Sequence, residues 1–128
     1  MTTAARIEIT LPWPPSVNGY YRAIVRGKHA TQILSAKGRA YKQAVLEIVI
    51  ADGNPSVLGT VKVTERFYPP DLKKRDIDNH RKAYRDGIEN AGVIENDCLI
   101  KEDHGYWCEV DRKNPRVELV IERIGGAA

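Results

Sequence analysis

Prolines constrain this chain more than any other feature, because they fix where its extended segments must end. A strand in the middle of a sheet does not accommodate proline, which lacks a backbone N–H and fixes its own φ. Arg6–Leu11 alternates polar and apolar residues, as a half-buried strand does, and Pro12–Asn18 then contains three prolines. A second strand candidate, Thr60–Tyr68, ends at Pro69-Pro70. The chain is therefore expected to leave its sheet at both places.

Two segments have the three- and four-residue spacing of amphipathic helices. Ser35 is expected to be the N-cap of the first, whose apolar residues recur until Gly53 ends it. The second, Asn79–Ala91, is expected to be capped by Asp78 and ended by Gly92.

Further strands are expected on both sides of these helices. Val117, Leu119 and Ile121 alternate within Arg116–Ile124 and give the clearest strand pattern. Other candidates are two strands flanking a turn at 103–105 and one hairpin closed by Arg26-Gly27. These segments are Cys98–Lys101 and Tyr106–Val110 for the first pair, and Tyr20–Val25 and Lys28–Ile33 for the hairpin.

Strands and helices that are interspersed in this way indicate an α+β fold. We expect one compact domain over residues 1–128, with a mixed or antiparallel sheet and two main helices. A chain of 128 residues suits one such domain. Residues 1–5 and 125–128 are expected to be frayed ends.

Composition excludes several classes of protein. With 42% hydrophobic and 29% charged residues, the sequence is typical of a globular protein and not of a disordered one. No apolar stretch approaches the roughly 20 residues of a membrane span, and no secretion signal opens the chain, so a cytoplasmic protein is expected. Cys98 and Cys108 match no redox or zinc spacing and are interpreted as free thiols. The net charge of +3 permits a polyanionic partner.

Acidic residues suggest a metal site between the strand at 60–68 and the second helix. Asp76 and Asp78 are two positions apart, so in an extended segment their carboxylates project from one face, roughly 6–7 Å apart at the backbone. Both then reach one hard cation such as Mg²⁺, which prefers oxygen ligands. The alternative is that Asp78 only caps the helix. Asp97, after the turn at 92–94, is a candidate third carboxylate.

Cations surround this acid pair. Positive charges at the N-terminus of a helix oppose the helix dipole, so helix stability does not explain these residues. Binding of a phosphate explains them better. The alternative hypothesis is that they form a solvated charged face. Lys82 lies four positions after Asp78 and either stabilises charge on a phosphate or pairs with Asp78. His80 is interpreted as a surface residue, and the aromatics beside Arg22 as packing or base-stacking residues. The candidate DNA-binding residues are Lys73, Lys74, Arg75, Arg81, Arg85 and Arg22.

Two motifs together resemble a known family. The opening segment Ile9–Arg22, with its Leu-Pro-Trp-Pro-Pro-Ser core, is followed by Arg75-Asp-Ile-Asp-Asn79, Lys82 and Asp97. In order and spacing these residues resemble the RusA family of Holliday-junction resolvases, small endodeoxyribonucleases often carried by prophages.

The resemblance implies a homodimeric, Mg²⁺-dependent enzyme that nicks four-way junction DNA symmetrically in recombination and repair. Mn²⁺ is expected to substitute for Mg²⁺, and no small-molecule cofactor is expected. By the same resemblance, Asp76, Asp78 and Asp97 are the catalytic and metal-binding carboxylates and Lys82 is the catalytic lysine. A non-catalytic module that binds branched DNA, and a nuclease for flaps or forks, are the alternatives.

Overall fold

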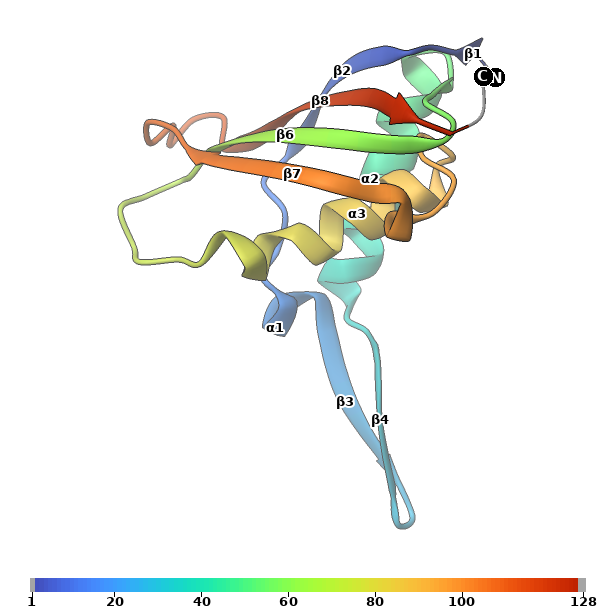
Figure 1. Cartoon of the computed structure of the whole chain (residues 1–128). Helices are drawn as coiled ribbons and strands as arrows, with labels where there is room; N and C mark the ends of the chain where they lie inside the picture. The colour runs from blue at the N-terminus through green and yellow to red at the C-terminus, as the bar shows by residue number, and fades with distance from the viewer. Residues whose placement is uncertain (1, 127–128) are drawn as a thin grey trace.

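A computed structural model describes residues 2–126 and shows a mixed α+β fold built on one four-stranded sheet (Figure 1). Its strand order is β2-β8-β6-β7. β6 runs parallel to β7 and antiparallel to β8, and β8 runs antiparallel to β2, so the sheet is mixed. The α+β expectation is therefore confirmed. The strands are β2 Arg6–Pro12, β6 Thr60–Tyr68, β7 Ile100–Trp107 and β8 Arg116–Gly125.

Two helices, α2 (Ala36–Ala51) and α3 (Arg81–Asn90), cover one face of this sheet (Figure 1). Ser35 caps α2 as expected, because its Oγ accepts from the N–H of Gly38 at 2.9 Å. The two helices approach closely where Gly87 has no side chain: a Cβ there would lie 3.0 Å from Val45. The core between sheet and helices contains the inward side chains of β2, β6 and β8, including Leu11, Val63, Phe67, Leu119 and Ile121.

A hairpin extends away from this body as an arm (Figure 1). A short helix, α1 (Val17–Tyr20), leads into β3 (Tyr21–Arg26), which pairs with β4 (His29–Leu34). The expected hairpin is thus present, with each strand beginning one residue later than expected. We call residues 21–34 the arm.

The structure corrects the expectation for residues 98–110. One strand, β7, runs through the expected turn at 103–105 and lies beside β6 along its length. The polar residues that resemble a turn are tolerated because β7 is the edge strand and because Asp103 and Gly105 face charged side chains from α3.

Part of the two segments that were expected to be frayed has regular structure. Thr2–Thr3 forms β1, which pairs in parallel with β5 (Pro55–Ser56), and Ala4 N–H donates to Ser56 O at 2.8 Å. Gly125 is the last residue of β8, so the expectation of frayed ends is wrong for these segments. Residues 1, 127 and 128 lie outside the described residues.

The structure also bears on membrane spans and on the two cysteines. Within residues 2–126, no helix has the length and apolar character needed to cross a membrane. Cys98 and Cys108 are both free, as expected.

Candidate active site

The acid pair lies where the chain returns from the sheet to α3. After β6, the loop 69–76 leads into a 3₁₀ turn, Ile77–His80, which continues directly into α3. Asp76 caps this turn, because its Oδ1 accepts from the N–H of Asp78 at 3.0 Å. The expectation that Asp78 caps the helix is therefore wrong. The sequence pattern predicted that the helix begins at Asn79, but the helical segment begins with the 3₁₀ turn at Ile77. The residue that precedes this turn and caps it is therefore Asp76.

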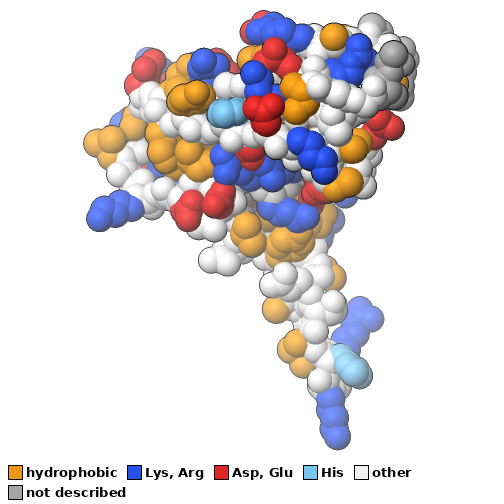
Figure 2. Space-filling model, viewed as in Figure 1, with side chains coloured by type: hydrophobic (Ala, Val, Ile, Leu, Met, Phe, Trp, Pro, Cys, Tyr) orange, Lys and Arg blue, Asp and Glu red, His pale blue; other side chains and the backbone are white. Residues whose placement is uncertain are grey.

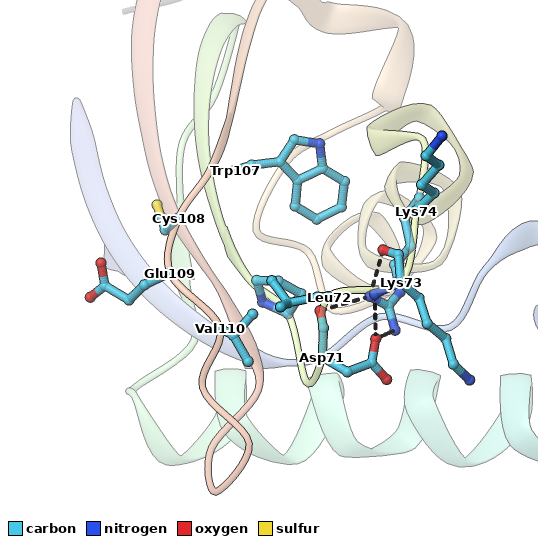
Figure 3. Close-up of a pocket in the computed structure, with 10 residues that line it drawn as sticks. Asp71, Leu72, Lys73, Lys74, Trp107, Cys108, Glu109 and Val110 are labelled. Atoms are coloured by element: carbon cyan, nitrogen blue, oxygen red, sulfur yellow. Dashed lines mark hydrogen bonds and ion pairs between the residues drawn. The ribbon is translucent and has the colours of Figure 1, made fainter.

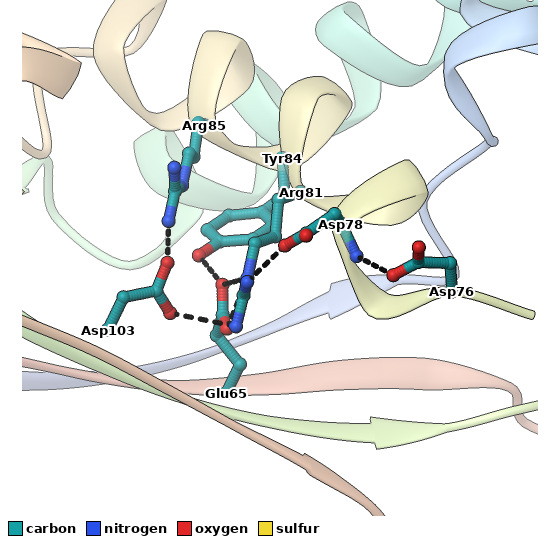
Figure 4. Close-up of polar contacts among 7 residues, drawn as sticks. All are labelled: Glu65, Asp76, Asp78, Arg81, Tyr84, Arg85 and Asp103. Atoms are coloured by element: carbon teal, nitrogen blue, oxygen red, sulfur yellow. Dashed lines mark hydrogen bonds and ion pairs between the residues drawn. The ribbon is translucent and has the colours of Figure 1, made fainter.

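Asp78 projects to solvent, with 75% of its side chain exposed, and Arg81 holds one of its oxygens (Figure 4). The Arg81 Nη1–Asp78 Oδ1 distance is 2.5 Å. The same guanidinium donates through Nε to Glu65 Oε1 at 2.9 Å, and Glu65 is fully buried on β6. Burial opposes the charge of Arg81, but Glu65 and Asp78 outweigh it and raise the pKa of Arg81. Arg81 thus links the exposed acid to the core of the molecule.

These contacts extend to β7. Asp103 pairs with Arg81 Nη2 at 3.2 Å and also with Arg85 (Figure 4). Tyr84 donates its hydroxyl to Glu65, and burial together with the Glu65 charge raises the pKa of Tyr84 well above its usual value. We call Glu65, Arg81, Tyr84, Arg85 and Asp103 the arginine network.

Gly105 makes room for this network. It lies opposite Glu65 in the β6–β7 register, and a Cβ at this position would be 2.7 Å from Arg81 Nη2 and 3.1 Å from Glu65 Oε1. A side chain at position 105 therefore competes directly with the Arg81 guanidinium for space.

Sequence reasoning missed most of this network. Arg81 and Arg85 were expected to bind DNA, but the structure places both in ion pairs within the protein. The one available signal was Glu65, a charged residue on the otherwise apolar face of the strand at 60–68. A buried acid requires a partner, and that requirement points to a nearby arginine.

Lys82 pairs with Asp86 and not with Asp78, which corrects the ion pair considered from the sequence. The Lys82 Nζ–Asp86 Oδ1 distance is 3.1 Å, and Tyr20 donates to the other oxygen of Asp86, also at 3.1 Å. The hydrogen bond to Asp86, together with the charges of Asp86 and Asp97, raises the pKa of Lys82. Lys82 is therefore a charged lysine in the first turn of α3, with 43% of its side chain exposed.

Asp97 begins a second 3₁₀ turn, Asp97–Leu99, at the far end of α3. Its N–H donates to Glu89 Oε1 at 2.7 Å. Across residues 2–126, no three Asp, Glu, His or Cys side chains gather closely enough to hold one metal ion. The structure therefore does not bring Asp76, Asp78 and Asp97 into one ligand group.

The chemistry of the donors nevertheless fits a hard cation. Asp76 and Asp78 are both exposed, and each uses Oδ1 in the contacts described above, so each has Oδ2 for another ligand. Carboxylate oxygens at a solvent-facing turn are suitable ligands for Mg²⁺, which retains several waters.

The basic residues before the acids divide into two kinds. Arg75 pairs with Asp71 at 2.6 Å and lies over the Trp13 ring, 5.6 Å from its centroid. The Lys73 N–H and the Arg75 guanidinium lower the pKa of Asp71. Lys73 and Lys74 are exposed on the loop, and Arg22 is exposed on the arm. These last three cations are free to meet a polyanion.

His80 is buried, which corrects its interpretation as a surface residue. Its Nδ1 bonds to Pro14 O at 2.9 Å, and its ring lies 4.9 Å from that of Trp13. Burial lowers the pKa of His80, a shift that the Pro14 hydrogen bond opposes. His80 thus ties the proline-rich segment to the start of α3.

Comparisons with known proteins agree with this arrangement. A family model described as Endodeoxyribonuclease RusA matches residues 12–122. A crossover junction endodeoxyribonuclease of Enterobacteria phage 82 is 37% identical over 121 residues, which cover 92% of this chain and 95% of the relative. Proteins called crossover junction endodeoxyribonuclease RusA from Shigella sonnei Ss046 and Escherichia coli K12 are 36% identical over 119 residues, with the same coverage.

The α+β fold, the exposed acids beside α3 and the family match together define the class of endodeoxyribonucleases. Within that class, the chain belongs to the RusA family. The resemblance inferred from the sequence is confirmed.

Proposed function

We propose that this protein is a divalent-metal-dependent endonuclease that resolves four-way (Holliday) DNA junctions by paired symmetric nicks, in recombination and repair. The observation that carries the proposal is the similarity, across 92% of the chain, to proteins called crossover junction endodeoxyribonucleases. We further propose that Mg²⁺ is the metal, with Mn²⁺ able to replace it, and that the protein acts as a homodimer.

The distribution of charge supports a DNA partner. Residues 9–46 contain no Asp or Glu, although this segment includes the whole arm. Lys and Arg side chains stand at the end of the arm in Figure 2, and no acidic side chain is visible on it. Such a segment attracts a phosphate backbone without internal competition from carboxylates. Its cations are Arg22, Arg26, Lys28, Lys37, Arg39 and Lys42.

In this proposal the acids hold the metal. Asp76 and Asp78 would supply two carboxylates from one turn, and Asp97 would be the third ligand. A bound divalent ion polarises the scissile phosphate and lowers the pKa of a water. Arg81 keeps Asp78 at the edge of the site by anchoring it to Glu65.

Lys82 and the loop lysines act on the phosphates. Lys82 carries a positive charge in the first turn of α3 and stabilises the negative charge that develops on the phosphate oxygens. Lys73, Lys74 and Arg22 contact phosphates farther from the cut, where they contribute binding that weakens with salt.

The test compares matched substrates of one sequence: a labelled mobile four-way junction, a flap, a fork and a linear duplex, each in Mg²⁺ and in EDTA. The proposal expects paired nicks at symmetric positions on the junction in Mg²⁺ and none in EDTA. Equal or faster cutting of the flap or the fork would replace it with a broader structure-specific nuclease. Binding without cutting, in Mn²⁺ as well, would replace it with a non-catalytic binding module.

A further inference from the structure

A pocket lies beside the candidate active site, between the loop 69–75 and residues 107–110 (Figure 3). It encloses about 360 Å³. Trp107 and Leu72 supply apolar surface, while Lys73 and Lys74 extend from the loop that forms the opposite wall. We call it the Trp107 pocket.

The apolar walls of this pocket are unusually exposed. Leu72 is 85% exposed and Trp107 is 43% exposed. Large apolar side chains that gather at a surface hollow rimmed by polar groups mark a binding site. Leu72 and the exposed part of the Trp107 ring are not covered by the core, so both are available to a ligand.

Trp107 is held rigidly from behind. Its ring stacks on Trp13, with centroids 6.1 Å apart and planes at 29°, and lies 5.6 Å from the buried ring of Phe67. The next residue, Cys108, donates its N–H to Phe67 O at 2.8 Å, which fixes the end of β7. The indole therefore presents a fixed flat surface to the pocket.

The pocket is also connected to the candidate metal ligands. A second, more open hollow shares Trp107, Lys74 and Arg75 with the first and reaches Asp76 and Ile77. A chain of nucleotides that passes Asp76 along this hollow therefore also passes Trp107.

We propose that the Trp107 pocket takes one unpaired nucleobase of the DNA strand that passes Asp76, with Trp107 stacking on the base and Lys73 and Lys74 contacting the adjoining phosphates. This inference rests on the proposed function for its DNA substrate. A flat aromatic ring beside cations is the general platform for an unpaired base, because every base has a face that stacks and a phosphate that attracts lysine. A peptide or a small apolar ligand would not require both lysines.

The test measures binding of a single-stranded oligonucleotide carrying 2-aminopurine, in EDTA, by fluorescence. Trp107→Ala is expected to weaken binding roughly tenfold and to abolish most of the fluorescence change, while Trp107→Phe retains most of both. Tyr106→Ala is the matched control, because Tyr106 is an exposed aromatic on the preceding position of β7, 51% exposed, and faces the other side of the sheet. It is expected to bind as the parent does.

A second variant guards against loss of folding, since Trp107 packs against Trp13. Leu72 is so exposed that Leu72→Glu leaves the melting temperature unchanged, yet it places a negative charge in the pocket. It is expected to weaken binding at least fivefold. Wild-type affinity in both Trp107→Ala and Leu72→Glu would overturn the proposal.

A scan of abasic sites through a four-way junction, also in EDTA, locates the base. At one position, removal of the base is expected to weaken binding by the parent protein but not to weaken binding by Trp107→Ala any further. Such non-additive effects are expected when the base and Trp107 are in direct contact. Additive effects at every position would overturn the proposal. If these non-additive effects are found but the protein never cuts DNA, the proposed base-binding pocket is supported and the proposed nuclease function is wrong. Failure of the pocket proposal can therefore be distinguished from failure of the nuclease proposal.

Discussion

Arg81 is the residue on which the geometry of the site depends most. It joins the exposed Asp78 to the buried Glu65 and also contacts Asp103 on the neighbouring strand. Removing the cation that pairs with a buried carboxylate lowers the free energy of unfolding by about 3–5 kcal/mol. The contact with Glu65 therefore holds Arg81 in position. The acid that it contacts therefore has a defined position before any metal binds.

Gly105→Ala tests this dependence. The new Cβ would overlap Arg81 Nη2, so we expect a loss of about 1–3 kcal/mol in the free energy of unfolding and a slower cut, because Asp78 loses its anchor. Denaturant unfolding and single-turnover cleavage measure the two effects. Gly19→Ala is the control, since a Cβ there has only ordinary contacts, the nearest at 3.6 Å. A Gly105→Ala protein as stable and as active as the parent would contradict the account.

His80 predicts how stability depends on pH. Burial lowers its pKa in the folded chain below the ordinary value of 6.5, so the unfolded chain binds a proton more readily. Its contribution to stability is therefore complete above about pH 6.5 and is lost as the pH falls from there toward the folded pKa. We expect the unfolding free energy of the parent to fall more steeply than that of His80→Gln in that window.

The matched control for His80 is His104→Gln, at an exposed histidine on β7. It removes an imidazole without disturbing the contact between His80 and Pro14. Parallel profiles for the parent and His80→Gln would show that His80 does not titrate as the structure indicates.

At the scale of elements, regular patterns made much of the fold predictable. Apolar residues alternate from Val117 to Ile121 in β8 and, with the exception of Glu65, throughout β6. Ser35 and Gly53 mark the limits of α2, so local sequence determines these three elements. β7 was not predictable, because its polar residues face partners from α3 that lie far away in sequence. The Arg75-Asp-Ile-Asp-Asn79 motif was enough to locate Asp76 and Asp78. The contact between Arg81 and Glu65 joins residues that are far apart in sequence, so no local pattern predicted it.

The charge of the arm leads to a prediction about DNA binding. Replacing Arg22, Arg26 and Lys28 together with Gln removes cations and no core contact, because all three are exposed. We expect weaker junction binding and a salt dependence of log K less steep by up to about 2.7, since each phosphate contact contributes about 0.9. Titrations in EDTA at several salt concentrations measure both quantities.

A charge-matched control replaces Arg6, Lys62 and Lys101 with Gln. These cations lie on strands of the sheet, away from the arm. An equal loss of affinity in the arm variant and in this control would show that only net charge matters, and would remove the arm from the DNA interface.

At the scale of the whole molecule, one chain carries one candidate site, whereas a four-way junction presents two equivalent strands. A two-fold dimer matches that symmetry. We expect light scattering to give twice the 14.4 kDa of one chain, with or without junction DNA. A monomer at micromolar concentration that still makes paired nicks would contradict the proposed dimer.

We propose that the exposed acids at the start of α3 are required to cut the DNA that the lysines and arginines bind. The most direct measurement follows Asp78→Asn on a labelled four-way junction, with cleavage scored in Mg²⁺ and binding in EDTA. We expect cleavage to fall at least about a hundredfold, while junction binding and melting temperature stay at or above those of the parent. Asp52→Asn, at an exposed acid outside the site, is predicted to cut normally. Parental cleavage by Asp78→Asn, with binding unchanged, would contradict the account.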